Sequence, residues 1–138
     1  MAISSPCGKW TTIRLGRLPV AAINKYLGLT LVPGNVVFFW KAQEHSFTKE
    51  PHREPICSPH YADVITNPTH VGQQPKHKKK GKDEGFDLCR KISPTGLIIL
   101  MAIKMTPLKS GVYVVRSSYP LPLDTLERRV RIKTTFEI

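Results

Sequence analysis

One histidine and one lysine of this chain have the spacing of a pair that can act together. His45 and Lys49 stand four residues apart in the segment 41–49, where Ala42 and Glu44 favour a helix. Residues four apart on a helix project from the same face. A histidine titrates near neutral pH and can move a proton, and a neighbouring ammonium favours anions. The pair therefore predicts proton transfer on an anionic substrate, and the plain alternative is a surface histidine.

Four histidines fall between residues 41 and 70, the one stretch of the chain without excess positive charge. They are His45, His52, His60 and His70. Cleavage of RNA without a metal needs a base for the 2′-hydroxyl, an acid for the leaving 5′-oxygen and cations around the phosphate. Nearby cations also lower the pKa of a histidine and so favour its neutral, basic form. The composition of this stretch is therefore compatible with ribonuclease chemistry.

A zinc site is the rival explanation of the same histidines. Its candidate ligands would be His45, His52, Cys57, His60 and His70. Their spacings match no compact zinc pattern, and the chain contains no HExxH motif. The sequence therefore predicts no metal and no other cofactor. For His60, His70 and His77, a surface or capping role is the preferred interpretation.

Cations and hydroxyls gather at the end of the chain. Four cations and two hydroxyls lie within eight residues: Arg128, Arg129, Arg131, Lys133, Thr134 and Thr135. If the segment 131–138 is a strand, Arg131, Lys133 and Thr135 share one face. Such a face suits contacts with phosphate groups. The alternative is a half-exposed edge strand whose charges discourage aggregation.

Composition restricts the class of protein. The chain has 138 residues, which fits one domain, and a formal net charge of +11. Such a charge attracts polyanions: nucleic acid first, then an acidic protein, then an anionic membrane. Motifs of nucleotide hydrolases, dehydrogenases and α/β-hydrolases are missing. The three cysteines contain no CxxC pair, and no apolar run approaches the ~20 residues of a membrane helix. These features predict action in the cytoplasm, also after delivery there, and no membrane partner.

Hydrophobic spacing and turn residues predict the elements that must position these side chains. Helices are expected at 20–27, 41–49 and 59–65, with a single helical turn near Leu126 and Val130. Strands are expected at 10–15, 35–40, 86–92, 97–105, 112–118 and 131–138. The lysine-rich segment 71–84 is expected to be an exposed, mobile loop. This order predicts one α+β domain, residues 1–138, with helices on one face of an antiparallel sheet.

Several short motifs resemble one nuclease superfamily. The segment Gln43–Pro51 resembles the histidine-centred helix of phage and polymorphic-toxin nucleases in the barnase–EndoU–colicin–RelE-like (BECR) superfamily. Tyr61–Pro68 is similar to the helix and Asn-Pro step that follow in those domains. Gly111–Pro120 resembles their penultimate strand, and Lys133–Phe136 resembles their terminal strand. The resemblance covers residues 35–138, and leaves open whether residues 1–34, a strand and a helix, belong to the nuclease-like core.

The resemblance implies a curved antiparallel sheet of about four strands with helices packed on it. It also implies cleavage of tRNA or mRNA. By motif position, His45 would be the acid or base, Lys49 a phosphate contact, and Thr134 or Thr135 the hydroxyl on the last strand. Substrate contacts would come from Lys104, Arg116, Arg128, Arg131 and Lys133. His52 stands where such domains often carry a second histidine before proline, so His52 would replace or assist His45.

Two hypotheses follow from the sequence. The first is a metal-independent endoribonuclease toxin that cleaves RNA by histidine-assisted transesterification. Such a toxin would have an acidic antitoxin or immunity protein as its partner. The second is a non-catalytic basic module that binds nucleic acid, for example a phage structural protein. Its affinity for nucleic acid would fall steeply with salt.

Overall fold

Seven strands form one mixed sheet in the computed structural model, which describes residues 4–6, 8–75, 84–92 and 96–138. Their bounds are β1 Ile13–Arg17, β2 Asn35–Phe38, β3 His70–Gly72, β4 Gly85–Lys91, β5 Ile98–Lys104, β6 Tyr113–Pro120 and β7 Thr135–Glu137. The strand order is β1-β2-β6-β5-β4-β3-β7. All neighbouring strands run antiparallel except β2 and β6, which are parallel.

The expected antiparallel sheet of about four strands is therefore wrong, although the α+β class agrees with the structure. The N-terminal strands lengthen the sheet at one end, where Val36 of β2 lies beside Tyr113 of β6 in parallel register. The three-residue strands β3 and β7 lengthen it at the other end. Strands this short carry too little alternation to be found from the sequence. The expected strand 35–40 is β2 only as far as Phe38, because helix α2 begins at Trp40.

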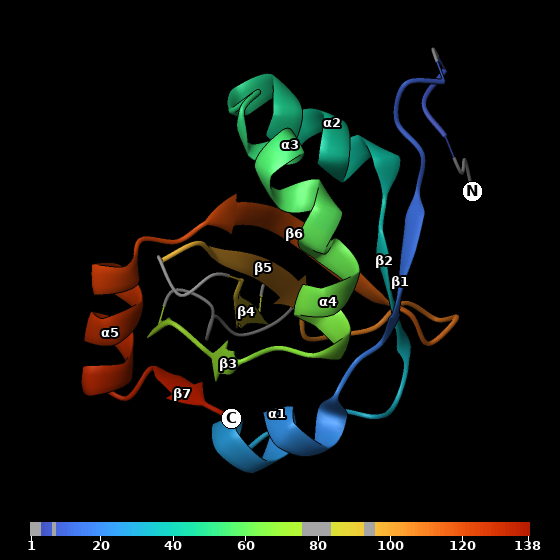
Figure 1. Ribbon diagram of the computed structural model, residues 1–138. Helices are drawn as coiled ribbons and strands as arrows, with labels where there is room; N and C mark the ends of the chain where they lie inside the picture. Colours follow the sequence, from blue (N-terminus) through green and yellow to red (C-terminus); the bar gives the residue numbers. More distant parts are fainter. Residues whose placement is uncertain (1–3, 7, 76–83, 93–95) are drawn as a thin grey trace.

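One face of the sheet is covered by the helices that precede β3 (Figure 1). They are α1 Val20–Leu27, α2 Trp40–Lys49, α3 Arg53–Cys57, a 3₁₀ turn at Ser58–His60, and α4 Tyr61–Thr66. The expected helices at 20–27, 41–49 and 59–65 are confirmed within a residue or two. Helix α1 ends at Gly28, whose φ of 65° is left-handed and favours glycine. Helix α3 was not expected, because its five residues follow Pro51 and contain Pro55.

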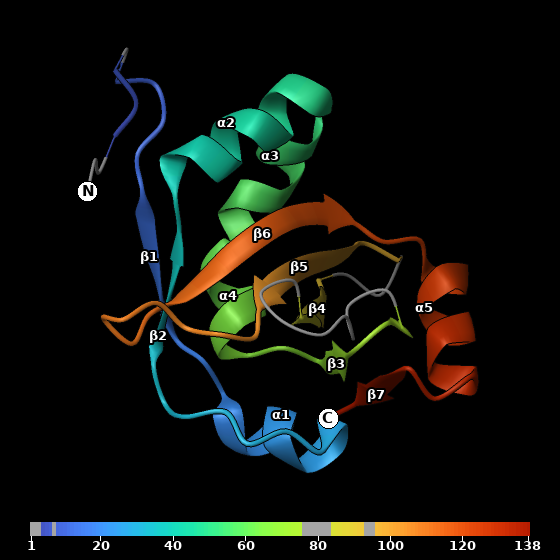
Figure 2. The ribbon, with the colours of Figure 1, turned by 180° about the vertical axis from the view of Figure 1, so that it is seen from behind.

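The opposite face of the sheet carries α5, Leu123–Arg131 (Figure 2). Alternate residues of β5 face the two sides. Ile99 and Met101 join the larger core, while Ile98 and Leu100 pack with Leu126 of α5. This arrangement explains the continuous apolar run from 97 to 103, because a strand covered on both faces needs no polar side.

The expected strand 131–138 is wrong over its first half. Arg131 ends helix α5, Lys133 turns the chain with a left-handed φ of 61°, and β7 begins only at Thr135. The last turn of α5 holds Arg128, Arg129 and Arg131, and positive charges near a helix C-terminus are favoured by the helix dipole. These cations therefore terminate a helix and do not alternate along a strand.

The expected exposed loop 71–84 is wrong at its beginning. Strand β3 pairs with both β4 and β7, all its residues are buried, and the following Gln73 and Gln74 are buried too. The lysine run within 76–83 lies outside the described residues. At the other end of the sequence, Leu15, Leu18 and Ile23 belong to the main core. Residues 13–27 are thus an integral part of the sheet and its core.

Candidate functional site

The structure separates the residues that the sequence places in one groove. His45 and Lys49 are exposed on α2, which packs against β6 and α3. Thr134 and Thr135 lie at β7. In both views of the ribbon, α2 and β7 are at opposite ends of the molecule (Figures 1 and 2). A phosphate held by His45 and Lys49 is therefore out of reach of the hydroxyls at the chain end.

The two threonine hydroxyls take part in contacts within the fold. Thr135 is 2% exposed, and its hydroxyl accepts a hydrogen bond of 3.5 Å from the side-chain amide of Gln74. The Thr134 hydroxyl donates to the backbone carbonyl of Arg129 over 3.3 Å. Both hydroxyls thus help to fix the turn between α5 and β7.

The remaining candidates are spread over the molecule. Lys104 is exposed at the end of β5, opposite Gly85 of β4. Arg116 of β6 is also exposed, and its Nη1 would lie 3.5 Å from a Cβ placed on Gly85, so these two cations share one end of the sheet. Arg128 and Arg131 are exposed on α5, and Lys133 is exposed in the turn that follows. His52 lies at the corner between α2 and α3, where its Nε2 is 3.7 Å from a carboxylate oxygen of Glu50.

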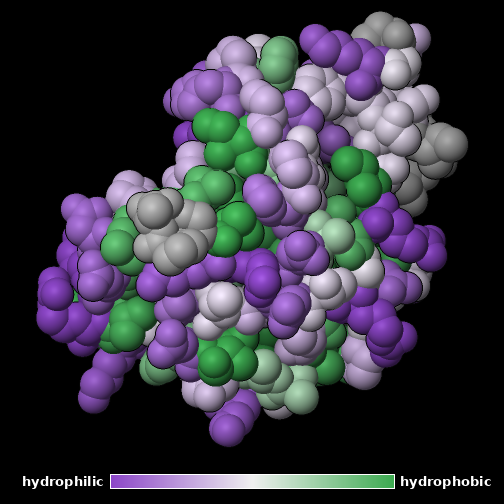
Figure 3. All heavy atoms as spheres, in the orientation of Figure 1, coloured by the Kyte–Doolittle hydropathy of each residue, from purple (hydrophilic) through white to green (hydrophobic). Residues whose placement is uncertain are grey.

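A cavity of about 410 Å³ lies between α5 and the strands β3, β4 and β7. We call it the α5 pocket; it is lined by His70, Lys91, Leu123, Leu126, Glu127, Val130, Arg131 and Glu137. Its volume falls within the usual range for small-ligand sites. On the surface, hydrophobic residues appear beside α5 within a mainly hydrophilic area (Figure 3). Helix α5 contributes apolar side chains together with the charged Glu127 and Arg131, and the strands contribute polar side chains.

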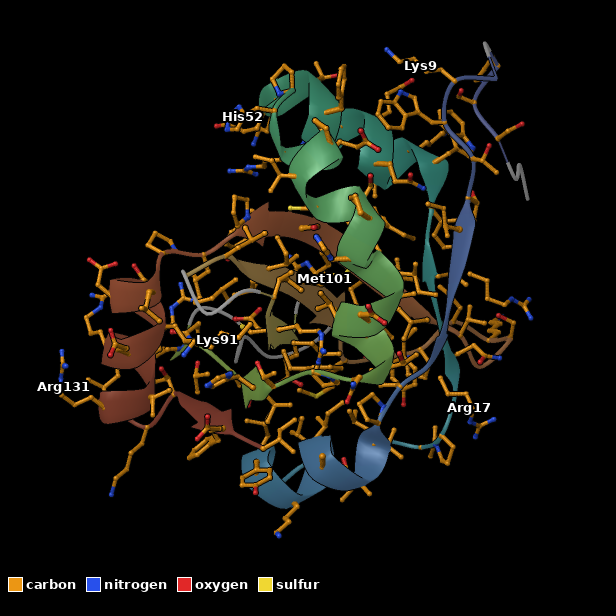
Figure 4. The ribbon with its side chains drawn as sticks, in the orientation of Figure 1. Lys9, Arg17, His52, Lys91, Met101 and Arg131 are labelled. Carbon is orange, nitrogen blue, oxygen red and sulfur yellow. The ribbon has the colours of Figure 1, made fainter. Side chains whose placement is uncertain are left out.

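Strand register explains why three polar side chains meet in this pocket. His70 pairs with Cys89 of β4 on one side and with Glu137 of β7 on the other. Directly paired residues point to the same face, and Lys91 follows Cys89 at the spacing of two that keeps that face. The register therefore directs His70, Lys91 and Glu137 toward α5, and Figure 4 labels Lys91 on the strand side and Arg131 on the helix side.

His70 is the most constrained ionisable group of the pocket. Its side chain is 4% exposed, and Nδ1 lies 2.9 Å from the hydroxyl of Thr69. The same hydroxyl accepts a hydrogen bond of 3.0 Å from the backbone N–H of Lys91. Nε2 is then the ring nitrogen left for a ligand. Burial lowers the pKa of His70 below its ordinary value of 6.5; Glu137 opposes this change and Lys91 adds to it.

Helix α5 is held over the strands by apolar and polar contacts. Leu126 is 2% exposed and packs in the smaller core with Cys89 and Leu100. Arg129 reaches the sheet, where its Nη1 lies 4.0 Å from a carboxylate oxygen of Asp87 on β4. Their side chains are 14% and 1% exposed, so water screens this ion pair weakly. The pocket wall is thus fixed relative to His70.

Sequence reasoning missed the main residues of this site. The sequence predicts a surface or capping role for His70, which is buried in the structure, and predicts no role for Lys91 or Glu137. The one local signal is the run Thr69-His70-Val71, which follows Asn67-Pro68 directly and holds two β-branched residues that favour a strand. The nearby lysines favoured a loop and concealed this three-residue strand.

Metal ligands, cysteines and membrane-spanning helices were considered as well, within the described part of the chain. In residues 4–6, 8–75, 84–92 and 96–138, no group of three or more histidine, cysteine or acidic side chains could hold a metal ion. Cys57 and Cys89 are buried, free thiols. Of the helices in that part of the chain, none has the length and apolar character needed to cross a membrane.

Comparisons of the chain with protein-family models, with curated proteins and with solved structures gave no match. The geometry of the pocket is therefore the basis for the functional argument.

Proposed function

We propose that this protein is a metal-independent endoribonuclease toxin whose active site is the α5 pocket. One observation carries the proposal: His70 and Glu137 are cross-strand partners that face a single cavity. Lys91 and Arg131 line the same cavity. An imidazole, a carboxylate and two cations supply the acid, the base and the charge balance that transesterification of RNA needs.

In the proposed reaction, Glu137 accepts the proton of the ribose 2′-hydroxyl. The 2′-oxygen attacks phosphorus, and the bond between phosphorus and the 5′-oxygen breaks. Protonated His70 donates its Nε2 proton to the leaving 5′-oxygen. Lys91 and Arg131 balance the negative charge that develops on the phosphate oxygens. The products are a 2′,3′-cyclic phosphate and a free 5′-hydroxyl.

The lowered pKa of His70 gives this mechanism a characteristic pH dependence. The acid must be protonated, and burial reduces the protonated fraction of His70 at neutral pH. Cleavage should therefore decline as pH rises through the folded-state pKa of His70, which lies below the ordinary value of 6.5. A stronger acid also donates its proton more readily, so the fraction that is protonated reacts faster.

Charge supports the same proposal, and the motif resemblance supports its nuclease class, while the motif residue His45 lies outside the α5 pocket. A formal net charge of +11 attracts RNA and accelerates its association. Membership of the BECR superfamily, action in the cytoplasm and inhibition by an acidic partner protein belong to the proposal as well. Such a partner would neutralise the basic surface around the pocket.

Incubation of the purified protein with tRNA in the presence of a chelator tests the proposal. The wild type should cleave the tRNA and leave 2′,3′-cyclic phosphate ends. Glu137→Gln should lower the rate at least ~100-fold, the size of a lost acid or base. Glu137 is exposed, so the substitution leaves the core intact. Glu44→Gln on α2 is the control that removes the same charge away from the pocket.

Intact tRNA after incubation with folded wild-type protein would overturn the nuclease proposal. Retarded migration of that intact tRNA would instead support the non-catalytic nucleic-acid-binding module. Equal cleavage rates for the wild type and Glu137→Gln would remove the α5 pocket from the mechanism.

A further inference from the structure

A second group of contacts runs from the corner between α2 and α3 to helix α5. The guanidinium carbon of Arg53, on α3, lies 5.4 Å from the centre of the Tyr119 ring, on β6. Arg53 Nη2 is 3.9 Å from one carboxylate oxygen of Glu50, and His52 Nε2 is 3.7 Å from the other. His52 marks this corner in Figure 4. Arg53 thus lies over the Tyr119 ring and is also paired with the carboxylate of Glu50.

The Tyr119 ring is held in place by the smaller core. It packs against the smaller core beside Leu100 and Leu126. Burial raises the pKa of the Tyr119 hydroxyl, Asp87 adds to the rise, and a hydrogen bond from Arg129 opposes it. The hydroxyl is therefore neutral at physiological pH and has a charged donor as its partner. Contacts from the sheet and from α5 fix the ring, and the Arg53 guanidinium lies over it.

We propose that Arg53 and Tyr119 form a second nucleotide-binding subsite, in which Arg53 moves off the Tyr119 ring to bind a phosphate of single-stranded RNA and one base stacks on the ring in its place. Stacking on an aromatic side chain accepts any base, and arginine binds phosphate with two parallel hydrogen bonds. The Arg53 side chain is 30% exposed and Glu50 43%, so a phosphate can displace Glu50 from Arg53. In the free protein Glu50 pairs with Arg53, and RNA must displace Glu50 in order to bind this cation.

The subsite adjoins the α5 pocket through shared residues. Leu126 lines the pocket and belongs to the same cluster of side chains that Tyr119 packs against. A nucleotide flanking the one in the pocket would therefore reach Tyr119 along the N-terminal part of α5. This inference rests on the proposed function in taking RNA as the ligand, while its test does not depend on cleavage.

Fluorescence anisotropy with a short, labelled 2′-O-methyl RNA tests the subsite, because such RNA has no free 2′-hydroxyl and cannot be cleaved by transesterification. Arg53→Ala and Tyr119→Leu should each weaken binding about tenfold, within the range of one lost stacking or phosphate contact. Tyr119→Phe keeps the ring and should bind like the wild type. Glu50→Gln should bind more tightly, because it releases Arg53.

Arg17→Ala is the matched control, since Arg17 lies on the other side of the molecule and its loss removes the same charge (Figure 4). Unfolding curves will show that each variant is folded. The subsite is wrong if Arg53→Ala and Tyr119→Leu bind no more weakly than Arg17→Ala, or if the wild type shows no saturable binding. Tight, Tyr119-dependent binding by a protein that leaves tRNA intact would retain the subsite and reject the nuclease. Normal tRNA cleavage, with RNA binding unchanged in Arg53→Ala and Tyr119→Leu, would retain the nuclease and reject the subsite.

Discussion

Helix α2 and the α5 pocket each bring a histidine and a lysine together, but by different means. On α2, His45 and Lys49 are neighbours because four residues make one helical turn, and both remain exposed. In the α5 pocket, His70, Lys91 and Glu137 come from three strands and line one cavity. Burial there lowers the pKa of His70. Helical spacing yields adjacent side chains, whereas strands with a helix over them bring together side chains that are distant in sequence, and one of them, His70, is buried.

Replacing each histidine in turn should separate the two regions most clearly. His70→Gln should reduce tRNA cleavage about 100-fold, because it removes the proposed acid from the pocket. His45→Gln should stay within about twofold of the wild type, as expected for an exposed residue outside the reacting groups. Initial rates of tRNA cleavage under identical conditions measure both effects. A larger loss for His45→Gln than for His70→Gln would move the active site back to α2.

The sequence predicts well those elements that carry a long pattern. Helix α1 has apolar residues at helical spacing between Pro19 and Gly28, and the structure confirms its bounds. Strand β5 was found from its uninterrupted apolar residues, which pack on both faces of the sheet. In each case, local chemistry and burial favour the same conformation, so no distant contact was needed to identify the element.

The candidate site was not predictable in the same way. His70 acquires its surroundings from Cys89 and Glu137, which are distant in sequence and become neighbours only through strand register. No spacing rule connects residues 70, 91 and 137. The cations of 128–133 were interpreted as one face of a strand, but helix formation separates them and leaves only Arg131 in the pocket. The motifs therefore predict the chemistry of a ribonuclease, but they do not predict which residues form its site.

Two adjacent arginines of α5 allow a test of how the pocket wall is held. Arg129 pairs with Asp87, whose side chain is 1% exposed, while Arg128 is exposed. Arg129→Met should lower the free energy of unfolding by about 2 kcal/mol, because a buried carboxylate loses a charged partner. Arg128→Met should change it by less than about 0.5 kcal/mol. Urea denaturation measures both. Equal effects would show that α5 is held by its apolar contacts alone.

The smallest expected effect concerns the pH dependence of stability. The folded-state pKa of His70 lies below the ordinary value of 6.5 that it regains on unfolding, with burial as the main cause. Between these two pKa values the unfolded chain binds more protons, so stability falls as pH falls through this window. The stability that the neutral form of His70 contributes is fully present above pH 6.5. The free energy of unfolding of the wild type should therefore drop more between pH 7.5 and pH 5 than that of His70→Gln.

The same proton has opposite consequences at His70: it enables the proposed acid to act, and it costs folding free energy because the ring is buried. Cleavage should thus increase toward acidic pH over the range in which stability declines. Parallel urea titrations and cleavage rates across that range would show this opposition. If His70→Gln and the wild type lost the same stability on acidification, the His70 ring would be solvated, and the burial that distinguishes it from His45 on helix α2 would be wrong.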